Sequence, residues 1–146
     1  MTTIRLEFER GGVFVARLLD DEAPRTCEAF KQMLPAEIRF RHSMVCGQAI
    51  ASMSTPAQFA PEKENQRNAG ILPGALSLLV RDPSIKIGYQ IYISYGMFSS
   101  RLVKLDEKHP VNVFGQIDAG IEELRTACGR ILIDGAESVK CSIQRS

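Results

Sequence analysis

The chain has 146 residues, of which 45% are hydrophobic and 24% charged, and its 18 basic and 17 acidic side chains give a formal net charge of +1. This balance is typical of one globular domain, which we expect to span residues 1–146. A nucleic-acid-binding protein needs a surplus of basic residues, which this chain lacks. No apolar run approaches the ~20 residues of a membrane span.

The N-terminal residues read as the start of a strand, since no basic segment leads into a hydrophobic one, and we expect a cytoplasmic protein. The four cysteines contain no pair at C-x-x-C spacing, so we predict reduced thiols in the core: Cys27, Cys46, Cys128 and Cys141. Two histidines and scattered carboxylates do not make a metal-binding set, and we predict neither a metal nor a cofactor.

A hairpin and a helix are predicted first. Apolar residues alternate along Thr3–Glu9, Gly11-Gly12 is a turn, and Val13–Leu18 is a second strand. Pro24 suits the first position of a helix, where its missing N–H has no partner to lose. The helical spacing of apolar residues ends at Pro35.

The rest of the chain predicts mainly strands. They are Ile38–Val45, Gln48–Met53, Ala75–Val80, Tyr89–Tyr95, Val111–Ile117 and Ser138–Gln144. Gly47 is a candidate bulge or turn. A second helix is predicted from an N-cap at Asp118 to a stop at Gly129. Segments 54–72 and 97–110 are long connections, which in compact domains are commonly functional. About eight strands and two helices that do not alternate predict a closed or nearly closed antiparallel barrel.

The order and spacing of four segments resemble the cyclophilins, which are peptidyl-prolyl isomerases. The segments are Ala23–Phe30, Phe40-Arg41-His42, Pro73–Leu78 and Lys108–Gly115. Glu64-Asn65 and Tyr89–Ile93 add to the resemblance, which implies a mostly β, closed antiparallel barrel of about eight strands capped by two helices. The chain is also similar to a bacterial group of uncharacterised cyclophilin-like proteins that brings no activity with it.

The departures from the cyclophilin pattern fall on the residues of the reaction. In that family an arginine of an F-H-R motif hydrogen-bonds the prolyl nitrogen as the amide twists. Here His42 stands in the aligned position and Arg41 comes one residue earlier. Side chains alternate along a strand, so we predict that Arg41 points away from the cleft. The tryptophan of the cyclophilin rim has no counterpart, because the chain contains none.

The resemblance implies a cleft, whose candidate residues are Phe40, Arg41, His42, Cys46, Gln48, Gln90, Tyr92, His109 and Phe114. Tyr92 takes the place of a pocket phenylalanine and makes the cleft more polar. His42 and Cys46 are also a candidate acid–base or nucleophile pair, against a backbone-bonded histidine and a buried thiol. Glu64 and Asn65 are candidates for tying down the long loop through side-chain hydrogen bonds.

We interpret the chain as a cyclophilin-like domain that binds a small polar molecule or a short peptide in the former proline cleft, with prolyl isomerase activity weak or lost. One alternative is an active isomerase that positions Arg41 through a bulge near Gly47. Another is an unrecognised small-molecule enzyme that uses the same cleft. A third is a structural homo-oligomer that pairs through an exposed β edge.

Overall fold

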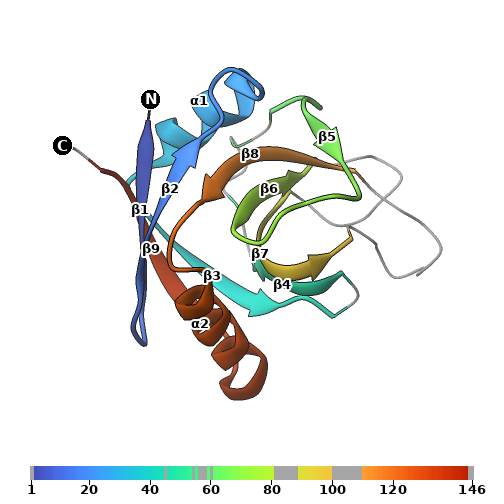
Figure 1. Cartoon of the computed structure of the whole chain (residues 1–146). Coiled ribbons are helices and arrows are strands. Elements are labelled where there is room, and N and C mark those ends of the chain that lie inside the picture. Colours follow the sequence, from blue (N-terminus) through green and yellow to red (C-terminus); the bar gives the residue numbers. More distant parts are fainter. Residues whose placement is uncertain are drawn as a thin grey trace.

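The computed structural model describes residues 2–44, 46–53, 55, 59, 61–80, 89–99 and 110–144. Nine strands and two helices occur in this part of the chain (Figure 1). They are β1 (Thr3–Phe8), β2 (Val13–Leu18), α1 (Pro24–Met33), β3 (Ala36–His42), β4 (Gly47–Ser52), β5 (Gln66–Arg67), β6 (Ala75–Leu79), β7 (Gln90–Phe98), β8 (Val111–Ile117), α2 (Ile121–Asp134) and β9 (Glu137–Ile143).

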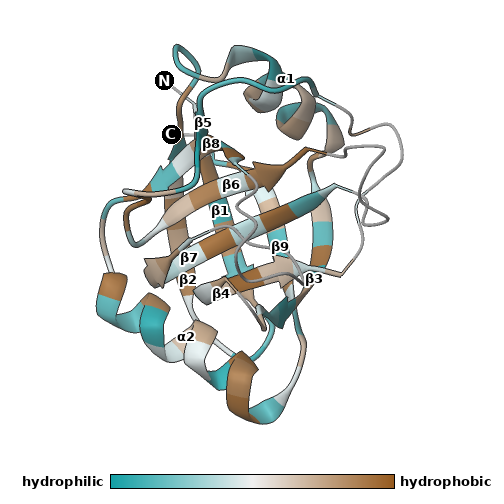
Figure 2. Ribbon diagram, turned by 90° about the vertical axis from the view of Figure 1, so that its right-hand side faces the viewer, coloured by the Kyte–Doolittle hydropathy of each residue, from teal (hydrophilic) through white to brown (hydrophobic). Residues whose placement is uncertain are grey.

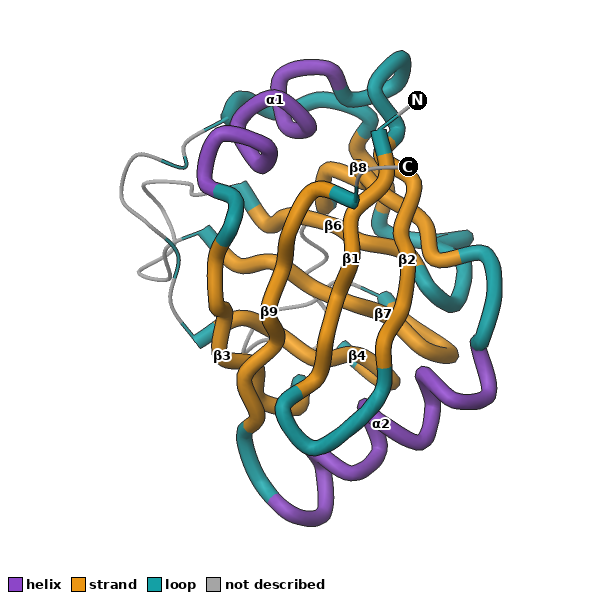
Figure 3. The backbone as a smooth tube through the Cα atoms, turned by 90° about the vertical axis from the view of Figure 1, so that its left-hand side faces the viewer, coloured by secondary structure: helices purple, strands orange, loops and turns teal. Residues whose placement is uncertain are grey.

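Eight of the strands form a closed antiparallel barrel. Their order is β2-β1-β9-β3-β4-β7-β6-β8, and pairing of β2 with β8 closes the ring, with Ala16 opposite Ile117. Strand β5 lies outside the ring and pairs with β8 (Figure 3 shows the barrel from the side of β1 and β9). The prediction of a closed, mostly β barrel with two helices is confirmed.

The barrel interior is filled by alternate residues of each strand. In β1 and β2 every second side chain is buried, as the period of two along a strand requires. The helices close opposite ends of the barrel (Figure 2). Phe30 of α1 and Leu124 of α2 belong to the same apolar cluster as the inward-facing strand residues. Neither helix in the described part of the chain is long and apolar enough to cross a membrane.

Two predicted boundaries of the second helix are wrong. Gly129 lies inside α2, and Gly135, with a φ of 95°, is the C-cap residue that ends it. The N-cap is Gly120, and the carboxylate of Asp118 accepts a 2.6 Å hydrogen bond from Arg17 Nε. The short strand β5 lies in a segment that was predicted as a connection. All four cysteines are buried and none forms a disulfide, as predicted.

A buried carboxylate joins the β1–β2 turn, α2 and β9. Glu137 is fully buried, and its oxygens accept hydrogen bonds from Arg10 Nε at 2.9 Å and Arg130 Nη2 at 2.7 Å. Arg10 also donates to the carbonyl of Gly135, and Arg130 to that of Gly11. Burial alone would raise the pKa of Glu137, but the hydrogen bonds and charges of the two arginines outweigh it and lower that pKa.

We expect Glu137→Gln to lower the free energy of unfolding by about 3 kcal/mol, because it leaves two guanidinium groups facing a neutral amide. Urea denaturation measures the loss. The control is Glu7→Gln, which removes a surface ion pair with Arg5 and should change stability by less than about 0.5 kcal/mol. Equal losses in the two variants would contradict a special role for Glu137.

The same carboxylate predicts a pH dependence. Its pKa is lowered in the folded state, so it stabilises the fold above the unfolded-state value near 4.5. That contribution is lost as the pH falls through the folded-state pKa. The wild type should therefore lose stability more steeply in acid than Glu137→Gln, and identical slopes in urea denaturation at a series of acidic pH values would argue against this.

Candidate ligand-binding face

Five side chains lie side by side on five neighbouring strands of the barrel. Pairing places Arg41 of β3 opposite Ala51 of β4, and Ala51 opposite Tyr92 of β7. Tyr92 is opposite Ser77 of β6, and Ser77 is opposite Val113 of β8. Residues directly opposite each other in antiparallel strands share a face of the sheet. We call these five residues the cross-strand row.

The row lies on the outer face of the barrel. The chain neighbours of its members fill the interior, because the two faces alternate along every strand. These neighbours are Phe40, Ile50, Leu76, Leu78, Ile91, Ile93 and Phe114. Tyr92, Ala51 and Val113 belong instead to a second apolar cluster on the outside of the sheet. Phe40 and Phe114, predicted as cleft residues, are therefore core residues.

The prediction that Arg41 turns away from the cleft side is wrong, because Arg41 shares the outer face with Tyr92. The first and third residues of an F-H-R motif lie on one face of a strand. Here Phe40 is 1% exposed inside the barrel, so its neighbour Arg41 must face outward, where it is exposed. The β3–β4 pairing has no register shift at Arg41; the irregularity lies between Gly47 and Ala49.

Tyr92 provides a protonated phenol in the middle of the row. The side chain is buried, and its hydroxyl donates a 2.8 Å hydrogen bond to Oε1 of the half-buried Gln90. Burial raises the pKa of the Tyr92 hydroxyl, interaction with the Cys46 thiol raises it further, and the charge of Arg41 acts in the opposite direction. The phenol therefore remains a hydrogen-bond donor across the physiological pH range.

Ser77, which lies opposite Tyr92, is unusual among the buried polar residues. It is fully buried, and among the described residues its Oγ is the buried side-chain polar atom that lacks a hydrogen-bond partner. A buried hydroxyl in this state costs about 1–3 kcal/mol. Ser94, another buried serine of the neighbouring strand β7, has its hydroxyl satisfied by the carbonyl of Leu72 at 2.9 Å.

His42 and Cys46 do not form the candidate pair. Strand β3 ends at His42 and β4 begins at Gly47, so the two residues do not lie four positions apart on one strand. His42 Nε2 is 2.7 Å from the Tyr95 hydroxyl, and its Nδ1 is 2.8 Å from the carbonyl oxygen of Ser43. Cys46 is buried in the outer cluster with Tyr92. An unrecognised small-molecule enzyme would therefore have to use groups other than a His42–Cys46 pair.

The remaining predicted cleft residues have separate surroundings. Gln48 Oε1 accepts a 2.9 Å hydrogen bond from the backbone N–H of Met97, so this amide holds the end of β7. His109 lies outside the described residues. No group of three or more histidine, cysteine, aspartate or glutamate residues in the described part of the chain could hold a metal ion.

The loop that carries Glu64 and Asn65 is bonded to α1 and β8. Glu64 Oε1 accepts a 2.5 Å hydrogen bond from the backbone N–H of Thr26, and Asn65 Nδ2 donates to the carbonyl of Val113 at 2.7 Å. Asn112, which the sequence analysis missed, is fully buried and bonds to both Glu64 N and Thr26 Oγ1. The signal for Asn112 was a polar residue between two valines of a strand.

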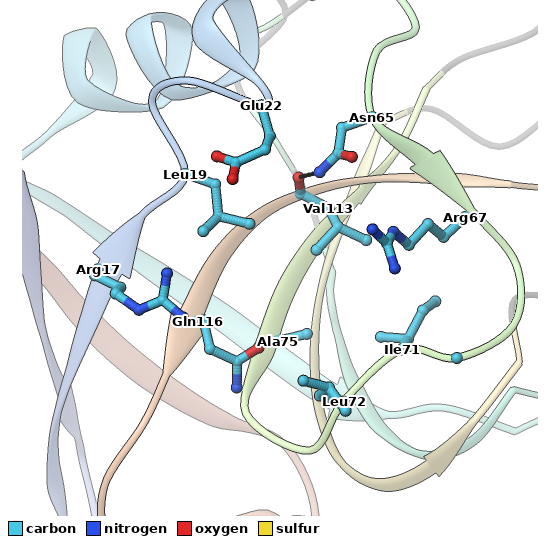
Figure 4. Close-up of a pocket in the computed structure, with 11 residues that line it drawn as sticks. Arg17, Leu19, Glu22, Asn65, Arg67, Ile71, Leu72, Ala75, Val113 and Gln116 are labelled. Atoms are coloured by element: carbon cyan, nitrogen blue, oxygen red, sulfur yellow. Dashed lines mark hydrogen bonds between the residues drawn. The ribbon is translucent and has the colours of Figure 1, made fainter.

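A cavity of about 220 Å³ borders the row near Val113, between β2, β8 and the β5–β6 segment (Figure 4). Its apolar wall includes Leu19 and Ile71. Three charged side chains also line it, from β2, the turn before α1, and β5: Arg17, Glu22 and Arg67. The sequence does not indicate this group, because its members are far apart in the chain and carry no motif.

Solved structures with the same architecture include cyclophilins. A Cryptosporidium parvum cyclophilin-type peptidyl-prolyl cis-trans isomerase matches with a TM-score of 0.61 and 17% identity, over 99% of this chain and 98% of that one. The Mimivirus cyclophilin matches with a TM-score of 0.64 and 19% identity, over 99% and 90%. McbB, solved in complex with tryptophan, matches with a TM-score of 0.74 and 17% identity, over 98% of this chain and 45% of that chain.

These identities establish a shared fold and no more. The chain spans less than half the length of the McbB chain. No curated protein matches it in sequence. By sequence, the chain belongs to the DUF3830 family, described as proteins of unknown function, whose model matches residues 6–143.

The cost assigned to Ser77 can be measured. We expect Ser77→Ala to raise the free energy of unfolding by about 1 kcal/mol, because it removes an unsatisfied buried hydroxyl. The matched control is Ser94→Ala, which should lower it by about 1 kcal/mol because the Leu72 carbonyl loses its donor. Urea denaturation separates the two signs, and a loss for Ser77→Ala equal to that of Ser94→Ala would show that Ser77 already has a partner.

Proposed function

We propose that this cyclophilin-like domain binds a small polar molecule or a short peptide at the cross-strand row, with prolyl isomerase activity weak or lost. The observation that carries the proposal is the shared outer face of Arg41 and Tyr92. A guanidinium group can bind a carboxylate or carbonyl, and the neighbouring phenol and Gln90 amide add a donor and an acceptor.

The chemistry of the row favours a polar ligand over a prolyl ring. Tyr92 carries a hydroxyl where the cyclophilin resemblance places a phenylalanine, and Ser77 beside it has a hydroxyl without an internal partner. The chain also has no tryptophan to form the apolar rim. A ligand with hydrogen-bonding groups would pair with the exposed guanidinium of Arg41 and with the amide of the half-buried Gln90, which a proline ring cannot do.

The position of Arg41 favours one second candidate, an active prolyl isomerase. Its guanidinium projects from the same face as Tyr92, where the resemblance places the catalytic arginine, and no bulge is needed to bring it there. His42 contacts Tyr95, so Arg41 is the residue that this alternative requires.

Prolyl cis/trans exchange on a proline peptide, read by NMR, decides between the two candidates. For the wild type and for Arg41→Ala we expect uncatalysed exchange, with a time constant of about tens to hundreds of seconds. The control is Arg39→Ala, an exposed arginine two residues away on the same strand face. Catalysis by the wild type and by Arg39→Ala that disappears in Arg41→Ala would instead establish the isomerase.

Ligand binding at the row has its own test, a thermal-shift screen of small polar metabolites and short peptides. A ligand present at 100 times its Kd should stabilise the fold by about 2.7 kcal/mol. We expect at least one compound to stabilise the wild type and Arg39→Ala, and to lose its effect in Arg41→Ala and Tyr92→Phe. Stabilisation that survives both row substitutions would place the ligand elsewhere and contradict the proposal.

A further inference from the structure

The cavity beside the row combines opposite charges with an apolar wall. Figure 4 shows Glu22 above Leu19 and Arg67 beside Val113, both reaching toward the cavity from different segments. Glu22 comes from the turn before α1 and Arg67 from β5, the strand outside the barrel. The loop beside β5 is held to β8 by the Asn65–Val113 hydrogen bond, and the backbone of Arg67 pairs with Val111 of β8.

Only part of the charge in this cavity is already neutralised. Arg17 forms a two-point contact with Asp118, with Nε 2.6 Å from Oδ2 and Nη2 3.3 Å from Oδ1. No ion pair joins Glu22 to Arg67 in the described part of the chain. The hydrogen bond with Asp118 and, more weakly, the charge of Glu22 raise the pKa of the Arg17 guanidinium. The two charges that remain available therefore have opposite signs and face one small cavity.

We propose that this cavity binds a zwitterion of the size of one amino acid with an apolar side chain. The carboxylate binds the Arg67 guanidinium, the ammonium group binds Glu22, and the side chain packs on Leu19, Ile71 and Val113. Planar guanidinium groups suit carboxylates in a two-point geometry. The volume of about 220 Å³ is smaller than the ~300–1,000 Å³ of pockets for drug-sized ligands, and therefore favours a ligand of the size of one amino acid.

The site is distinct from the proposed ligand at the row. Val113 borders both, but Arg41 and Tyr92 do not line the cavity. Loss of zwitterion binding would leave the row proposal standing, and loss of binding at the row would leave the cavity proposal standing.

Isothermal titration calorimetry with six probes tests the charges separately. The probes are L-leucine and L-phenylalanine, their amides, which lack the carboxylate, and 4-methylpentanoate and 3-phenylpropanoate, which lack the amine. We expect at least one amino acid to bind, and its amide and its amine-free acid each to bind at least about tenfold more weakly. Failure of both amino acids to bind, or equal binding of the matching amide or acid, would overturn the proposal.

Matched variants assign each charge. Arg67→Gln should weaken the binding of the amino acid by about tenfold and leave the binding of its amide unchanged. Glu22→Gln should weaken the binding of the amino acid to a similar extent and leave the binding of the amine-free acid unchanged. Arg25→Gln and Glu62→Gln remove an exposed ion pair outside the cavity and should change nothing. An amino acid that binds equally to wild type, Arg67→Gln and Glu22→Gln would contradict the assignment.

Discussion

The pairing of β2 with β8 is the contact on which the rest of the structure depends. It converts an open sheet into a ring. Along every strand of this ring, side chains alternate between the interior and the outer face. The interior then takes the apolar set, closed at both ends by α1 and α2. The outer face carries a second apolar cluster together with the exposed Arg41, and both candidate sites lie there.

Polar side chains inside this frame are almost all paired. Glu137 is held by two arginines, and Asn112 connects a loop to a helix through its amide. Both bridge segments that are far apart in the chain, so they hold the ends and the loop of the barrel in place. Ser77 differs because its buried hydroxyl has no partner among the described residues. A folded protein gains no stability from such a group.

The cyclophilin-like fold does not by itself decide an activity. The structural neighbours share the barrel at 17–19% identity, and the DUF3830 family carries no assigned function. On the outer face of this chain, Arg41 and Tyr92 lie in one cross-strand row, and the charged cavity opens next to that row. Functional evidence must therefore come from these residues.

Local patterns in the sequence determined the elements, because strand and helix periodicity follow from backbone geometry alone. Alternating residues located β1 and β2, and Pro24 marked the start of α1. Only the tertiary structure decided the faces of Arg41 and His42, since strand phase depends on which residue enters the interior, here Phe40. It also placed Glu22 and Arg67 at one cavity and paired Glu137 with Arg10, because distant segments come together only after the barrel closes.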